Sequence, residues 1–270
     1  MKNLKERAKS IRINVLKSIF AAGSGHTGGS LGLADLMTFL YFSEMNHRPS
    51  EPLWKERDRL VLSIGHVAPV LYATLAEAGY FSKDELMSLR KLGRRLQGHP
   101  GRDHGLPGIE LSAGSLGQGL SVAVGMALAD QLDQKDRRVF CIMGDGELQE
   151  GSVWEAAMSA GHHQLNNLIG IVDRNQVQID GYTEDVMKLE PLRQKWEAFN
   201  WSVIECDGNE FTSIEAAFKQ IQQTSDKPSL IIAHTKMGRG VSSIEGDYRW
   251  HGKAPNDHEL EIFMKELAKT

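Results

Sequence analysis

The chain has 270 residues, 41% of them hydrophobic, which is enough to bury one large core or two small ones. Its net charge is −4 and its basic residues are scattered, so nothing indicates a nucleic-acid surface, which needs a clustered basic face. The two cysteines, Cys141 and Cys206, lie inside apolar runs and are expected to be reduced core residues in a reducing compartment.

The first expected element is an amphipathic N-terminal helix and not a signal peptide. Its apolar residues on one helical face are Leu4, Ile11, Val15 and Ile19. Residues 111–129 form an uncharged stretch that approaches the length of a membrane span. Its Gly, Ser and Gln content favours a glycine-rich turn that leads into a buried helix. We therefore expect a soluble cytoplasmic protein with no membrane segment.

The middle of the chain alternates short β-branched runs with helical patterns. Strands are predicted at residues 59–62, 139–143, 168–172, 201–205 and 230–233. Helices are predicted at residues 68–78, 119–131, 153–162, 191–199 and 213–223. A last helix is expected behind an Asp257 cap, with Leu260, Phe263, Met264 and Leu267 on one face. This order predicts an α/β fold, with a parallel sheet flanked by helices on both faces.

Polar residues and glycines follow four of the predicted strands. They read GDGE, DRNQVQID, CDGNE and HTKMGRG in chain order. In open α/β sheets, ligands bind at the carboxyl ends of the strands, and we expect the functional site at that edge.

The turn GDGELQEG holds three carboxylates between glycines. A helix N-terminus beside glycines suits a phosphate, but the turn is neither a Walker loop nor a GxGxxG motif. A helix end contributes roughly half a positive charge. Asp145, Glu147 and Glu150 outweigh it, so a phosphate needs a divalent cation between itself and the turn. Mg²⁺ uses one or two carboxylates plus substrate phosphates, and Gly146 would let the backbone approach a phosphate oxygen.

The next strand end supplies further oxygen ligands, namely Asp173, Asn175 and the carbonyls of NQVQ. Neighbouring parallel strands lie about 4.8 Å apart, so two adjacent ends can share one ion. The alternative is that Asp145 and Asn175 only cap helices. Their occurrence at consecutive strand ends favours a metal site.

Four of the ten histidines are flanked by glycine in loop-like settings: His26, His66, His99 and His251. Imidazole is the side chain best suited to proton transfer near neutral pH. Zinc is the alternative ligand, but the spacings contain no HxxxH or Cys/His motif. The pattern indicates imidazoles that need close backbone or ligand approach.

The segment GDGELQEGSVWEA, with Asn175 about thirty residues after GDG, resembles the thiamine diphosphate signature. SGHTGGSLG, LSIGH, QGHPGR, LPGIELSAGSLGQGL and WHGKAP follow the order found in transketolase. Residues 1–270 therefore resemble its single N-terminal, diphosphate-binding domain. The pyrimidine-binding and C-terminal domains are absent, which implies a natural N-terminal subunit of a split transketolase.

The resemblance assigns metal and diphosphate roles. Asp145, Asn175 and the Val177 carbonyl would hold Mg²⁺, or Ca²⁺ or Mn²⁺ as a substitute, together with diphosphate oxygens of thiamine diphosphate. Gly146 would contact the diphosphate. Glu147 has no catalytic role by this comparison and is expected to be a capping or solvated carboxylate.

The same resemblance assigns the rest of the cofactor site. Gly114, Ser115 and Leu116 would lie along the aminopyrimidine. Ile179 would pack near the thiazolium and help to impose the bent shape of the cofactor.

The histidines and one further glutamate complete the implied site. His66 and His251 would line the diphosphate and thiazolium region. His26, His99 and His251 would face the sugar hydroxyls and move protons during carbon–carbon cleavage. Glu150 matches a family glutamate in a carboxylate network between the two cofactor sites.

The implied activity is transfer of a two-carbon ketol unit from a ketose or ketose phosphate to an aldose or aldose phosphate. In the family, a glutamate of the facing protomer's pyrimidine-binding domain activates the cofactor. We therefore expect this chain to be inactive alone, to need a second chain, and to self-associate across a dimer axis in a two-plus-two heterotetramer.

The sequence departs from the family pattern beside the substrate channel, at Thr27, at Ser115 and in the stretch SIEGDYRWHG. The donor and acceptor sugars therefore stay open, including whether the ketose is an ordinary pentose phosphate. Three alternatives also stay open. They are another thiamine diphosphate enzyme (a deoxyxylulose-phosphate synthase or 2-oxoacid dehydrogenase subunit), a non-catalytic thiamine diphosphate-binding module, and a metallohydrolase that uses Asp145 and the histidines.

Overall fold

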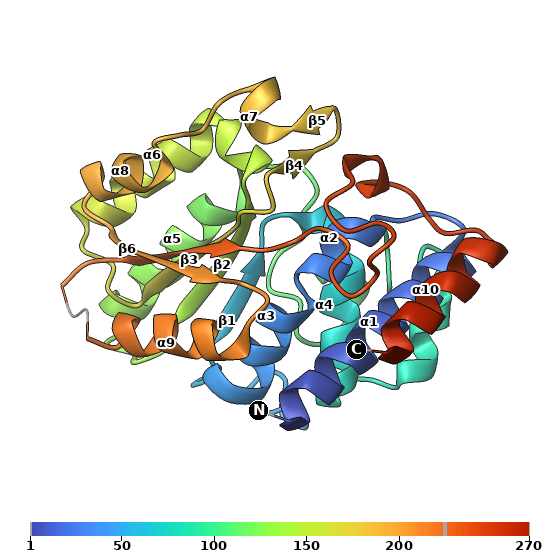
Figure 1. The fold of residues 1–270 in the computed structure, drawn as a ribbon. Helices are drawn as coiled ribbons and strands as arrows, with labels where there is room; N and C mark the ends of the chain where they lie inside the picture. Colours follow the sequence, from blue (N-terminus) through green and yellow to red (C-terminus); the bar gives the residue numbers. More distant parts are fainter. Residues whose placement is uncertain (1, 224–225, 270) are drawn as a thin grey trace.

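A five-stranded parallel sheet forms the centre of the computed structural model, which describes residues 2–223 and 226–269 (Figure 1). The strands are ordered β1-β2-β3-β7-β6. They span Arg59–Leu62 (β1), Val139–Gly144 (β2), Leu168–Asp173 (β3), Ser202–Asp207 (β6) and Ser229–His234 (β7). A small antiparallel hairpin, β4 (Val177–Gln178) and β5 (Gly181–Tyr182), follows β3. All five strands predicted from the sequence are confirmed.

Helices cover both faces of this sheet (Figure 1). They are α1 (Lys2–Ala22), α2 (Thr27–Gly32), α3 (Ala34–Phe39), α4 (Ala68–Ala78), α5 (Gly119–Leu132), α6 (Gly151–His162), α7 (Thr183–Val186), α8 (Leu192–Ala198), α9 (Phe211–Ile221) and α10 (Asp257–Lys269). Short helical turns occupy Leu40–Glu44, Gly65–Val67, Lys83–Ser88, Arg102–His104, Gly146–Gln149 and Tyr248–Trp250. The expected α/β class is therefore observed, and the helices predicted from the sequence are present.

The sheet separates two hydrophobic layers. Phe140 and Ile142 of β2 face the layer that α1, α3, α4 and α9 cover. Cys141 and Met143 point to the opposite layer, beneath α5, α6 and α8. Strands buried on both faces read as continuous apolar runs, which is why β2 and β3 are almost free of polar residues. Both cysteines are free and buried, as expected.

The two terminal helices bury the faces that their sequences predict. In α1, Ile11, Val15 and Ile19 are fully buried and Leu4 is partly buried. In α10, Phe263 and Leu267 are buried, with Leu260 and Met264 packed beside them.

The cap predicted for the last helix is wrong by one residue. Asn256 accepts a hydrogen bond from the Glu259 backbone N–H at 2.9 Å, and the Glu259 carboxylate accepts one from the Asn256 N–H at 2.9 Å. This reciprocal pair is a capping box, and it makes Asn256 the cap while Asp257 begins the helix.

The expectation of a buried helix after the glycine-rich turn is only half correct. Helix α5 buries Leu120, Ala123 and Ala127 against the sheet. Its other side is exposed and almost uncharged, and Leu132 at its end is 83% exposed. Within residues 2–223 and 226–269, no helix has both the length and the hydropathy that a bilayer crossing requires.

Candidate active site

A cavity of about 480 Å³ opens at the carboxyl edge of the sheet, where the sequence predicts the functional site. Residues from eight segments that are separated in the sequence reach it. The predicted site residues that line it are His26, His66, His99, Gly114, Leu116, Asp145, Gly146, Glu150, Asn175, Val177, Ile179 and His251. Ser115 is exposed on the same loop and is not among the residues that line the cavity.

Strands β2 and β3 bring the two predicted metal-binding segments side by side. Gly144 is in register with Asp173, and the Asp145 N–H donates to the Asp173 carbonyl at 3.2 Å. The segments that follow these strand ends therefore meet at one point of the cavity wall. Gly146 begins the next helical turn, and a Cβ there would lie 3.3 Å from Gln178 Cβ, so this turn lies close against the β4–β5 hairpin.

The Asp145 carboxylate is buried, with only 1% of the residue exposed. Its Oδ2 accepts from the Gln176 N–H at 2.6 Å and from Arg174 Nη1 at 3.1 Å. Its Oδ1 accepts from the Gly146 N–H at 2.8 Å, which is the capping contact that the alternative interpretation requires. Burial raises the pKa of Asp145, while Arg174 and the backbone donors oppose that rise. Capping does not exhaust the lone pairs of a carboxylate, so a cation-binding role remains compatible with this contact.

Asn175 is held in a fixed orientation by its neighbours. Its Oδ1 accepts from the Val177 N–H at 2.9 Å, and its Nδ2 donates to Asp173 at 3.0 Å. Asp173 lies behind it and also accepts a hydrogen bond from the Thr235 hydroxyl. Burial raises the pKa of Asp173 to about 7.

The oxygen groups at these two strand ends fit a hard divalent cation. They comprise the Asp145 carboxylate, the Asn175 amide oxygen and the Val177 carbonyl, and all three residues line the cavity. Mg²⁺ takes oxygen ligands, usually one or two carboxylates that are completed by phosphate and water. The arrangement therefore leaves ligand positions for a diphosphate.

Three imidazoles that line the cavity form a close triangle. Ring centroids are 5.0 Å apart for His26 and His66, 5.1 Å for His66 and His251, and 5.4 Å for His26 and His251. His26 precedes α2, His66 lies in the turn after β1, and His251 follows the turn Tyr248–Trp250. His99 lies on a fourth segment and is more exposed.

Burial keeps these imidazoles neutral. It is the largest cause that lowers the pKa of His26 to about 4 and of His66 to about 3, and neighbouring imidazoles add to the effect. Burial also lowers the pKa of His251 and, together with Arg90, that of His99. A neutral imidazole has one donor and one acceptor nitrogen. The buried Nδ1 of His26 has no hydrogen-bond partner within the described residues.

The mouth of the cavity is partly apolar. Ile179, on the β4–β5 hairpin, is 70% exposed, and Leu116 lies on the 114–117 loop. A Cβ on Gly114 would lie 3.8 Å from His99 Cγ, so this glycine brings the loop near the imidazole. Glu150 is exposed at the cavity edge, immediately before α6.

Glu147 corrects one sequence-based expectation, because it is not solvated. The residue is 2% exposed, and its carboxylate accepts hydrogen bonds from the Ser63 hydroxyl and from the backbone N–H groups of Gly117 and Gly144. Burial raises its pKa, and these three donors oppose the rise. The surrounding sequence carries no signal of this burial, since a carboxylate in a polar turn ordinarily faces water.

Arg174 is a second residue that the sequence analysis missed. It is 3% exposed, and besides Asp145 it pairs with Glu184 at 2.7 Å and with Glu190 at 3.1 Å. These contacts tie the end of β3 to the segment around α7. One feature of the sequence could have indicated its role. Arg174 stands between Asp173 and Asn175, where its positive charge balances the neighbouring carboxylates.

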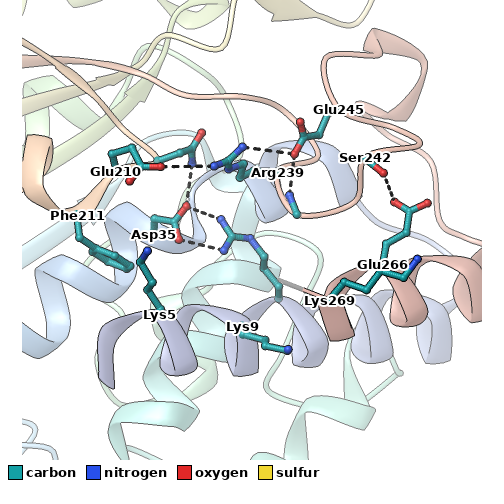
Figure 2. Close-up of a pocket in the computed structure, with 13 residues that line it drawn as sticks. Lys5, Lys9, Asp35, Glu210, Phe211, Arg239, Ser242, Glu245, Glu266 and Lys269 are labelled. Atoms are coloured by element: carbon teal, nitrogen blue, oxygen red, sulfur yellow. Dashed lines mark hydrogen bonds and ion pairs between the residues drawn. The ribbon is translucent and has the colours of Figure 1, made fainter. Parts of the chain in front are cut away.

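A second cavity, of about 380 Å³, lies away from this site (Figure 2). Its two arginines pair with carboxylates: Arg12 binds Asp35 at 3.0 and 2.6 Å, and Arg239 lies 3.7 Å from Glu210 and from Glu245. These pairs connect α1, α3, the start of α9 and the loop after β7. None of the predicted site residues lines this cavity, so we interpret it as structural.

Comparison with known proteins gives the family. Residues 4–268 match the family described as transketolase, thiamine diphosphate binding domain. The chain is 41% identical over 269 residues to an apulose-4-phosphate transketolase subunit of Phocaeicola vulgatus, covering 95% of that protein. It is 43% identical over 267 residues to the 6-deoxy-6-sulfo-D-fructose transketolase subunit SqwG of Clostridium sp., covering 97% of it.

Solved structures agree. The fold superimposes on the transketolase of Campylobacter jejuni with a TM-score of 0.93 at 33% sequence identity, and the match covers 99% of this chain but 43% of that one. The site and the fold define a protein of the thiamine diphosphate-binding class. The chain belongs to the transketolase family, as its thiamine diphosphate binding domain.

Proposed function

We propose that this chain is the N-terminal subunit of a two-chain transketolase that transfers a two-carbon ketol unit from a ketose phosphate to an aldose phosphate. One observation carries the proposal. A single cavity unites the GDG turn, Asn175 and four imidazoles, in a chain that matches transketolase subunits from end to end.

We assign the metal and cofactor contacts from the resemblance to the family, and the residues involved all line the cavity. Asp145, Asn175 and the Val177 carbonyl would hold Mg²⁺ together with the diphosphate, and Gly146 would contact the diphosphate through its backbone. Thiamine diphosphate, when bound, supplies the carbanion chemistry at its thiazolium ring.

The apolar part of the cavity wall holds the organic part of the cofactor. Gly114 and Leu116, which line the cavity, and Ser115, which is exposed on the same loop, would flank the aminopyrimidine. Ile179 would pack near the thiazolium. Glu150 belongs to a carboxylate network directed toward the second cofactor site of the assembly.

The imidazoles act on the sugar. His26, His99 and His251 donate or accept protons at its hydroxyl oxygens while the carbon–carbon bond breaks and forms, and His66 and His251 line the cofactor side. Their lowered pKa values keep them neutral, so each ring can offer one donor and one acceptor nitrogen. Neutral rings also avoid placing several positive charges beside one another.

We propose a donor ketose with an anionic terminal group. The similar subunits are named for apulose-4-phosphate and for 6-deoxy-6-sulfo-D-fructose. A phosphate and a sulfonate share the tetrahedral anionic head, and the two sugars differ elsewhere. The residues near the channel that depart from the family pattern, Thr27 and the segment before His251, are where we expect the choice between such sugars to be made.

The second chain carries the pyrimidine-binding and C-terminal domains. An apolar surface beside the cavity mouth supports this partner: Ile179 is 70%, Tyr182 50%, Val186 43% and Met187 59% exposed. Large apolar side chains that share one exposed surface mark an interaction site. The partner would cover the cofactor from this side and complete the site.

Self-association uses a different surface. The outer side of α5 is almost uncharged, with Leu132 83% exposed, and neighbouring α6 presents Met158 at 56% exposure. A helix that is apolar on all sides is ordinarily buried. We assign this side to the contact between two copies, which gives a two-plus-two heterotetramer.

The test is a ketol-transfer assay with this chain, the partner and their mixture, each with thiamine diphosphate and MgCl₂. We expect turnover of a ketose phosphate only in the mixture. An Asp145→Asn variant should abolish it, whereas Glu215→Gln, which changes a 45% exposed side chain of α9 outside the cavity, should not. Turnover by this chain alone would refute the two-chain proposal, and release of carbon dioxide from a 2-oxoacid would favour the other thiamine diphosphate enzymes.

A further inference from the structure

Three backbone segments meet at the carboxylate of Glu147. The first is the end of β1, represented by Ser63. The second is the 114–119 loop, and the third is the end of β2 at Gly144. Glu147 lies beneath their junction at 2% exposure and lines the cavity.

The two carboxylate oxygens of Glu147 accept hydrogen bonds from all three segments. Oε1 accepts from the Gly117 N–H at 2.7 Å and from the Ser63 hydroxyl, and Oε2 accepts from the Gly144 N–H at 3.1 Å. The Ser63 hydroxyl in turn accepts from the Gly119 N–H at 3.0 Å. One side chain thus satisfies donors from all three segments, in a place that is almost fully buried.

Glycines bring the 114–119 loop close enough for these bonds. A Cβ on Gly119 would lie 2.4 Å from Ser63 Cβ, and a Cβ on Gly117 would lie 2.7 Å from Glu150 Cβ. Gly117 also has a φ of +83°, which favours glycine. The loop therefore packs closely against the end of β1 and the start of α6, and the hydrogen bonds to Glu147 hold it in that position.

We propose that Glu147 is a positioning residue that fastens the 114–119 loop to the GDG turn, so that the two parts of the cofactor site are held in one arrangement. This inference rests on the proposed function for its cofactor: the loop faces the aminopyrimidine and the turn faces the diphosphate. Glu147 itself touches neither reacting atom and acts through the backbone that it holds.

The role requires an acceptor oxygen on each side of the side chain, and Glu147→Gln removes one of them with little change in size. The amide has one acceptor oxygen and one NH₂ group. If its oxygen faces Gly117, its NH₂ group opposes the Gly144 N–H, and the reverse orientation opposes the Gly117 N–H. Either orientation detaches one side of the junction.

Asp58→Asn is the matched control. Asp58 is also buried, at 5% exposure, and its carboxylate bridges the Asn46 and Arg138 backbone N–H groups at 2.9 Å each. It does not line the cavity. Asp58 also pairs with the Arg138 guanidinium at 2.7 Å. The two variants therefore share the replacement of one acceptor oxygen between two backbone N–H groups, and they differ in place.

Hydrogen exchange of the ligand-free full chain is the first readout. In Glu147→Gln we expect at least tenfold faster exchange of the Gly117 or Gly144 amide, and in Asp58→Asn no change at either amide. Ser63→Ala is a milder variant, in case Glu147→Gln does not fold, and it should speed exchange at Gly119. The proposal would be overturned if Glu147→Gln left exchange at Gly117 and Gly144 unchanged and Ser63→Ala left exchange at Gly119 unchanged.

Thiamine diphosphate affinity of the two-chain complex, with MgCl₂ present, is the second readout. We expect at least tenfold weaker binding in Glu147→Gln, a kcat within about threefold of wild type at saturating cofactor, and wild-type affinity in Asp58→Asn. If Glu147→Gln and Asp58→Asn lost the same amount of affinity, Glu147 would contribute only to folding. If Glu147→Gln lowered kcat without changing the affinity, Glu147 would act in the reaction itself. Either result overturns the proposal. A wild-type complex that binds no thiamine diphosphate would refute the proposed function, while the exchange data would still decide on the junction.

Discussion

Replacing His66 should make the stability of the protein less sensitive to acid. His66 is buried among other imidazoles, and its pKa is lowered from the usual 6.5 to about 3. The unfolded chain therefore binds a proton at this position at a higher pH than the folded chain does. Stability from this group is fully present above pH 6.5 and is lost as the pH falls toward 3.

The magnitude follows from the proton difference. Between about pH 7 and about pH 5, His66 of the unfolded chain becomes almost fully protonated, whereas the folded chain stays neutral there. One proton of difference is worth about 1.4 kcal/mol per pH unit, so integration over this range gives about 2 kcal/mol. His66→Asn should therefore lose about 2 kcal/mol less stability than the wild type over the same range.

Urea unfolding of the isolated chain at both pH values measures this difference. Comparing the pH-induced losses of the two proteins cancels most other titrating groups, and His66→Gln should give the same result because the effect comes from titration and not from shape. Equal losses in wild type and both variants would show that the imidazole is protonated in the folded chain. The assignment of neutral rings to proton transfer would then lose its physical basis.

Further substitutions test the packing and the site separately. Arg12→Met should cost about 3 kcal/mol in urea unfolding, because it leaves Asp35 buried without its guanidinium, yet it should not change thiamine diphosphate affinity. Asn175→Ala should weaken Mg²⁺-dependent cofactor binding by about 10- to 100-fold in titration calorimetry, since a ligand and its oriented neighbour are lost together, and unchanged binding would refute the metal assignment. Gly119→Ala should destabilise the isolated chain by about 1–3 kcal/mol, because the added Cβ would lie 2.4 Å from a neighbouring side-chain carbon. Gly125→Ala, on the open side of α5 with nothing within 4 Å, should instead stabilise it by about 0.5–1 kcal/mol, and destabilisation there would contradict the assigned exposure.

The strands were predictable because a parallel sheet buries both of its faces. A strand such as β2 must then be apolar at consecutive positions, and the run around Cys141 has few other interpretations. The edge that carries the site was also predictable, since the carboxyl ends of parallel strands meet on one side. Asp145 and Asn175 meet there as expected, and the motif order predicted the transketolase family.

What the sequence could not show depends on contacts between distant segments. From its local sequence, Glu147 is expected to be exposed, and it is buried only because the loop that ends at Gly119 packs on it. The sequence around Ser63 likewise does not indicate its hydrogen bonds to Glu147 and Gly119. The prediction that α5 is buried was only half correct for another reason. An uncharged helix sequence predicts that the helix is covered, but it does not tell whether the covering surface belongs to the same chain. The displaced cap of α10 is a smaller error, because Asn256 and Asp257 are both good capping residues and only the hydrogen bonds distinguish them.

The central claim is that this chain forms half of a thiamine diphosphate-dependent transketolase. A native mass spectrum of the protein, purified gently from its own host, tests it most directly. We predict a tetramer of two copies of this chain and two of a second chain, with two thiamine diphosphates and Mg²⁺. A homodimer without cofactor, unchanged by added thiamine diphosphate and MgCl₂, would contradict the claim and favour a non-catalytic binding module.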